Sequence, residues 1–218
     1  MGKEQLEEFN NLVKLEKELT KGWIKYWNEY SAYDDWHFWI LVVLSILPLI
    51  VLFLFMDRRR MFHLGFFGFN VHICHSYIDI AAVNLGKWTY PYKLIPIYPI
   101  SFAFDASLIP VTFMLLYQWT LNHKKNFYLY ATMPAFFFAF IAKPLLVAIN
   151  ITKPGPGGGG LKAYLILFVS HLIIAYESKW ITDLFRKFLV KDDFISSNQN
   201  LESVPSMPWN WVRVRKRL

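Results

Sequence analysis

A run of 19 residues without a charged side chain, from Phe38 to Met56, is the feature that most constrains the fold of this chain. An α-helix rises ~1.5 Å per residue, so about 20 apolar residues cross the ~30 Å hydrocarbon core of a bilayer. The run ends at the charged stretch from Asp57 to Arg60, which resists transfer through lipid. The sequence therefore predicts a membrane-spanning helix over this run.

Four further runs extend this prediction. With 55% hydrophobic and 18% charged residues, the chain is more apolar than soluble domains, which are about 25% charged. A single cysteine, Cys74, excludes a disulfide-stabilised secreted scaffold. The predicted fold class is all-α, a polytopic membrane helix bundle of about five transmembrane helices plus an N-terminal amphipathic helix. The further spans cover about residues 61–84, 96–121, 127–150 and 161–180.

The sequence divides into three parts: an amphipathic helix in residues 1–35, the five-helix transmembrane domain in 36–185 and a basic, partly disordered tail in 186–218. In residues 3–30, leucines and aromatic residues recur at three- and four-residue steps between Glu and Lys. That spacing is typical of a helix that lies at a membrane interface or docks on a protein partner.

Two segments outside the spans have unusual composition. The stretch KPGPGGGG, from Lys153 to Gly160, predicts a flexible link, and it lacks the Lys-Ser/Thr of a phosphate-binding loop. The chain ends in WNWVRVRKRL, where tryptophans beside basic residues favour an anionic lipid surface over nucleic acid. We therefore expect lipid contacts from Trp209, Trp211, Arg213, Arg215, Lys216 and Arg217.

The basic residues near the spans indicate the orientation of the chain. Three arginines follow the first span, Lys124 and Lys125 follow the third, and the segment after the fifth span is also basic. Lys and Arg next to spans favour the cytoplasmic side. We expect a multi-pass protein of the cell (cytoplasmic) membrane, with the N-terminus outside, the C-terminus inside and anionic lipid at the cytoplasmic face.

Ionisable residues inside the predicted spans mark a candidate site, because each costs roughly 2.5–3.5 kcal/mol at the centre of a membrane helix. At about 100° per residue, three polar residues of the second span share one helical face. Single polar residues on the third, fourth and fifth spans lie at overlapping depths. If these faces converge, the candidate cluster is His72, His75, Asp79, Asp105, Lys143 and His171.

Three interpretations of this cluster stay open. An aspartate paired with Lys143 and histidines that hydrogen-bond between helices would be structural. Asp and His at staged depths could instead form a pathway for protons, a cation or a polar solute. His72, His75 and Asp79 could also ligate a transition metal, the one cofactor that the residues suggest, although Lys143 opposes a dication.

Enzymatic signatures are weak, and the residues identify no catalytic group. The sequence has no GxSxG motif, and Cys74 points away from the polar face of its span. The cluster therefore favours a non-enzymatic protein that handles a small polar solute, a cation or protons, alone, as a homo-oligomer or as a subunit of a membrane complex. The alternatives are a structural or assembly protein and, third, a metal-dependent membrane enzyme.

The stretch DRRRMFHLGFFGFNVHICHSYIDIAAVNLGKWTYPYKLIPIYPISFAFDASLIP, from Asp57 to Pro110, carries a family resemblance together with FIAKPLL, from Phe140 to Leu146. These segments resemble a family of small polytopic membrane proteins of Gram-positive spore-forming bacteria. The resemblance covers roughly residues 36–185. It implies the membrane location and the helical fold, but it supplies no activity and no catalytic residues.

Overall fold

The computed structural model describes the backbone of residues 1–199 and the side chains of residues 1–188. The chain forms two units, Met1–Thr182 and Asp183–Leu218. All contacts of the candidate site lie in the first unit. The six tail residues for which we expect lipid contacts, from Trp209 to Arg217, lie outside the described residues.

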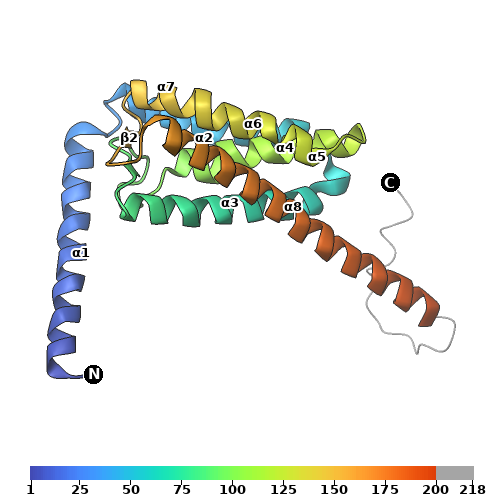
Figure 1. The fold of residues 1–218 in the computed structure, drawn as a ribbon, viewed down its shortest axis with the longest axis horizontal. Coiled ribbons are helices and arrows are strands. Elements are labelled where there is room, and N and C mark those ends of the chain that lie inside the picture. The colour runs from blue at the N-terminus through green and yellow to red at the C-terminus, as the bar shows by residue number, and fades with distance from the viewer. Residues whose placement is uncertain (200–218) are drawn as a thin grey trace. The chain divides into compact units, whose positions relative to one another are not determined.

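Helices dominate the described residues, which confirms the all-α prediction at the level of secondary structure (Figure 1). Two π-helical segments, η2 and η3, interrupt the regular α-helices, and two short strands pair with each other. In chain order the elements are α1 (Lys3–Tyr30), α2 (Trp36–Phe55), η1 (Arg58–Arg60), α3 (Met61–Asn84), β1 (Trp88–Thr89), η2 (Ala103–Leu108), α4 (Ile109–Asn122), α5 (Phe127–Tyr130), α6 (Thr132–Phe136), η3 (Phe137–Ala142), α7 (Lys143–Ala148), β2 (Lys153–Pro154) and α8 (Gly160–Gln199).

Three helical stretches of the described residues are long and apolar enough to cross a membrane: Trp36–Phe55, Phe127–Ala148 and Gly160–Phe188. They match the first, fourth and fifth predicted spans. The second and third predicted spans are not confirmed by length and composition, because α3 carries several polar residues and α4 has 14 residues. The predicted end of the transmembrane domain, at residue 185, falls inside a helix, because α8 continues to Gln199.

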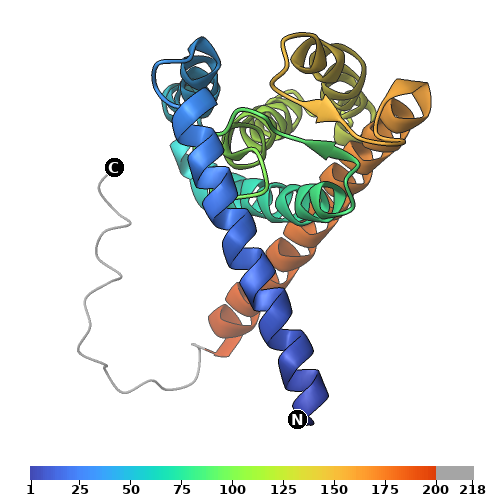
Figure 2. The same ribbon diagram turned by 90° about the vertical axis from the view of Figure 1, so that its left-hand side faces the viewer.

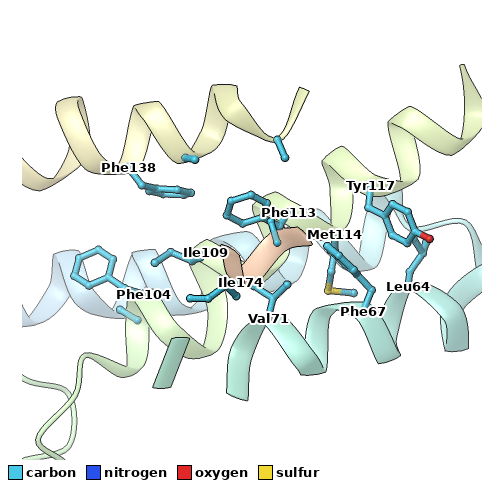
Figure 3. Close-up of a cluster of buried hydrophobic side chains, with 14 of the residues drawn as sticks. Leu64, Phe67, Val71, Phe104, Ile109, Phe113, Met114, Tyr117, Phe138 and Ile174 are labelled. Carbon is cyan, nitrogen blue, oxygen red and sulfur yellow. The ribbon is translucent and has the colours of Figure 1, made fainter. Parts of the chain in front are cut away.

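The core lies where α3 packs against α4 and is completed by η3 and α8 (Figure 3). Phe67 and Val71 of α3 and Phe113 of α4 are fully buried there. Gly68 lets the two helices approach closely, because a Cβ at this position would overlap the Met114 side chain. Close packing of small and large residues is how helices associate in lipid, where burial of apolar surface gives little driving force.

Two prolines explain the π-helical segments. Pro110 follows η2, and Pro144 follows η3, each two residues after the segment ends. Proline lacks an N–H and its ring displaces the carbonyl four residues earlier, so the hydrogen-bond ladder shifts locally to a wider turn. The shift matters because Asp105 lies inside η2 and Lys143 begins α7 directly after η3.

The glycine-rich loop is held in place and is not the flexible link that its composition predicts. β2 pairs antiparallel with β1, and the Gly155 N–H donates to the Lys87 carbonyl at 2.8 Å. A Cβ at Gly155 or Gly158 would overlap the backbone of Gly86 or Lys87. We call residues 86–89 and 153–158 the β1–β2 clip. Its close backbone approach explains why glycine occupies both positions.

The α1 helix runs across the direction of α2, α3 and α4, and it joins them at the end where β1 and β2 lie (Figures 1 and 2). Trp27 Nε1 donates to the Lys93 carbonyl at 2.7 Å, and the Lys93 N–H donates to Ser31 Oγ at 3.1 Å. The Lys93 ammonium lies 3.9 Å from the centre of the Trp23 ring. One loop residue therefore anchors the C-terminal end of α1 through three contacts.

Lys93 gives this anchor a pH dependence, because burial lowers its pKa to about 8. In the unfolded chain a lysine titrates at about 10.4, so between about pH 8 and pH 10.4 the unfolded state binds the extra proton. Stability attributable to Lys93 therefore rises with pH in this window. We expect the thermal midpoint of the wild type, measured in detergent from pH 7.5 to 10, to rise relative to that of Lys93→Met. Lys21→Met, on an exposed part of α1, is the matched control, and parallel curves for wild type and Lys93→Met would contradict the prediction.

Candidate functional site

Five of the six predicted site residues line one partly enclosed cavity of about 70 Å³. A buried water molecule needs roughly 10–15 Å³ of cavity volume, so this cavity has room for a few waters or one small ligand. The five residues come from four elements and are all buried: His75 and Asp79 of α3, Asp105 of η2, Lys143 of α7 and His171 of α8.

Asp79 is fixed by two donors from the loop that follows α3. Trp88 Nε1 donates to Asp79 Oδ1 at 2.7 Å, and the Tyr90 hydroxyl donates to the same oxygen at 2.8 Å. Burial and the nearby carboxylates raise the pKa of Tyr90 well above its ordinary value, so its hydroxyl stays a donor. Both aromatic residues also line the cavity. Neither residue is among the predicted site residues, and only their closeness to Asp79 in the chain was a signal for this role.

The second carboxyl group, that of Asp105, is buried and lines the same cavity as that of Asp79. The Oδ2 atoms of both residues are buried, and neither receives a hydrogen bond from the described residues. Two ionised carboxylates only accept, so a bond between them requires a proton. The pair is therefore a place where one proton, or one donor brought by a ligand, satisfies two buried oxygens.

Lys143 supplies the positive charge of the cavity. Its ammonium nitrogen lies 4.5 Å from the centre of the Trp88 ring and 5.8 Å from that of Tyr90. Within the described residues, no ion pair of 4.0 Å or less joins it to either aspartate. The direct lysine–aspartate pair of the structural interpretation is therefore absent from this arrangement, and the ammonium rests on aromatic faces instead.

Two histidines, His75 and His171, line the same cavity as Trp88 and Tyr90. The rings of His75 and His171 contact each other edge to face, with centroids 4.7 Å apart. His171 Nδ1 lies 2.6 Å from the Leu167 carbonyl, which only accepts, so Nδ1 carries the proton and Nε2 of the neutral ring is a bare acceptor. The Nε2 atoms of both histidines are buried without a partner among the described residues.

His72 is the predicted site residue that does not line the cavity. Its Nδ1 donates to the backbone carbonyl of Asp105 at 2.7 Å, so it holds η2 in position. His72, His75 and Asp79 therefore do not come together as the metal site that their spacing suggested. No group of three or more His, Cys, Asp or Glu side chains in the described part of the chain is arranged to hold a metal ion.

The formal charges of the cavity do not cancel. Two carboxylates and one ammonium leave a net charge of −1 when the histidines are neutral, as is usual near pH 7. Burying an uncompensated charge is costly, so uptake of one proton or one monovalent cation would neutralise the site.

Comparisons with protein-family models, curated proteins and solved structures found no match to this chain, so its functional assignment depends on this geometry.

Proposed function

We propose that this chain is a multi-pass membrane protein that binds and exchanges one proton or one small monovalent cation at the cavity. The observation that carries the proposal is the pair of buried carboxyl groups beside Lys143, each with an oxygen that has no donor among the described residues. A proton and a cation would compete to neutralise the same uncompensated negative charge. Their competition provides a physical basis for coupled exchange across a membrane.

The proposal includes five spans, with the N-terminus outside and the C-terminus inside. The charge pattern supports this orientation, because the arginines of η1 lie between α2 and α3, whereas β1 follows α3 at its other end. The exposed apolar side chains of α1, such as Leu12 and Leu19, support an interfacial helix on the outer surface. Anionic lipid at the cytoplasmic face and assembly with further subunits belong to the same proposal.

Proton displacement tests the proposal. At pH 7, adding sodium, potassium or ammonium chloride to the detergent-purified protein in weak buffer should release up to one proton per chain, reported by a pH-sensitive dye. Asp79→Asn/Asp105→Asn should release none, because the variant has no carboxyl group left to exchange. Asp34→Asn changes an exposed aspartate outside the cavity and should behave like the wild type.

Correct folding of the double variant is checked by circular dichroism and gel filtration. If it does not fold, Asp105→Asn alone serves, because it keeps the two hydrogen bonds that Asp79 accepts. A wild type that releases no more protons than these variants with any of the three salts would overturn the proposal.

A purely structural role is the second candidate. It is favoured by the two hydrogen bonds through which Asp79 ties Trp88 and Tyr90 to α3. This role predicts that the aspartate variants lose stability and that the wild type shows no salt-dependent proton release.

A further inference from the structure

We propose that the cation bound in the cavity is of the ammonium class, either ammonium itself or a small protonated amine, and not an alkali-metal ion. This inference depends on the proposed function, because it names the ligand of the same site. Its basis is the kind of atom that the cavity leaves without a partner, together with the aromatic character of its walls.

Among the described residues, five side chains that line the cavity each carry a buried polar atom without a partner, and each of these atoms is able to accept a hydrogen bond. They are the Oδ2 atoms of Asp79 and Asp105, Thr152 Oγ1 and the Nε2 atoms of His75 and His171. The Asp105 and His171 side chains are only 3% and 2% exposed, so bulk water does not satisfy them. Buried acceptors without donors are costly. A ligand that carries several N–H donors would satisfy them together.

An alkali-metal ion suits these atoms less well. Hard cations are bound in proteins by several oxygen ligands, from carboxylates, carbonyls or water. Here two of the five unsatisfied atoms are imidazole nitrogens, which accept N–H hydrogen bonds well but are not ligands that hard cations prefer. The lining therefore favours a cation that donates hydrogen bonds.

The cavity wall already accommodates an ammonium group. Lys143 places its own ammonium over the rings of Trp88 and Tyr90, at 4.5 Å and 5.8 Å from their centroids. Phe104 and Phe138 add further aromatic surface to the lining. Aromatic faces attract alkylammonium ions. A second, mobile ammonium is tolerated because the two carboxylates outnumber Lys143, which leaves one negative charge for it to neutralise.

Competition binding tests the inference with radiolabelled methylammonium as the probe. The full chain is purified in detergent, and bound probe is displaced with ammonium, potassium or sodium chloride at constant ionic strength. We expect ammonium to displace the probe at a concentration at least tenfold lower than potassium or sodium. His171→Phe should weaken probe binding at least tenfold, because it removes an acceptor and keeps an aromatic ring of related shape.

Two further variants keep the test decisive. His171→Asn retains a hydrogen-bond acceptor and should restore part of the binding, whereas His123→Ala, an exposed histidine outside the cavity, should bind like the wild type. Displacement by potassium or sodium as effective as that by ammonium would overturn the inference. So would an absence of probe binding, or unchanged binding in folded His171→Phe.

The inference and the proposed function fail in different ways. If methylammonium does not bind but sodium or potassium still releases protons in an Asp79- and Asp105-dependent manner, the ammonium assignment is wrong and the exchange site stands. If no salt releases protons and no probe binds, both are wrong.

Discussion

Replacing Lys143 with methionine should lower the free energy of unfolding, by less than the about 3–5 kcal/mol that breaking a direct buried ion pair costs, because this ammonium compensates the carboxylates without a direct contact. Lys143 is the one cation among the residues that line the cavity, and both of the facing carboxylates are buried. Methionine matches much of the lysine volume, so the change removes charge with little loss of packing. Unfolding of purified protein in a denaturing detergent, followed by circular dichroism, measures the loss.

The double variant Lys143→Met/Asp105→Asn should recover most of that stability. It removes one positive and one negative group, so the cavity returns to its original net charge, and Asp79 keeps its donors from Trp88 and Tyr90. The interaction energy from the double-mutant cycle reports the coupling directly. Lys162→Met, at an exposed lysine near the start of α8, is the matched control and should have little effect. Equal stability of wild type and Lys143→Met would show that this ammonium does not compensate the carboxylates.

Gly158→Ala should destabilise the protein by about 1–3 kcal/mol, the range for a group inserted where there is no space. The added Cβ would overlap the Lys87 carbonyl, which belongs to the backbone and cannot rotate away. The β1–β2 clip must then open. Because the clip carries Trp88, the donor to Asp79, opening it should also weaken cation binding at the cavity.

The neighbouring residue provides a control that differs by one position. A Cβ at Gly159 would meet Pro154 at 3.4 Å, an ordinary van der Waals distance. Gly159→Ala should therefore keep the wild-type thermal midpoint and the wild-type affinity for methylammonium. A Gly158→Ala protein as stable as Gly159→Ala would show that the clip tolerates the added methyl group and does not support the cavity.

The predicted cluster and the observed cavity agree in membership more than in detail. His75 and Asp79 share a face because helical periodicity is a local property that a sequence displays directly. His72 shares that face in the sequence, yet it turns to the Asp105 carbonyl. That carbonyl lies in η2, 33 residues away in the chain, and its position beside α3 depends on tertiary packing. Spacing along one helix cannot reveal such a partner.

The sequence alone determined that this chain contains membrane-type helices and that their polar residues must avoid lipid, because hydrocarbon penalises charge wherever it stands in the chain. Only the tertiary structure decided which polar faces meet. It separated Lys143 from direct ion pairs, brought Trp88 and Tyr90 onto Asp79, and paired the glycine-rich segment with β1. The physical reason is that burial depends on residue type, whereas hydrogen-bond partners distant in the chain depend on how the helices and loops pack together.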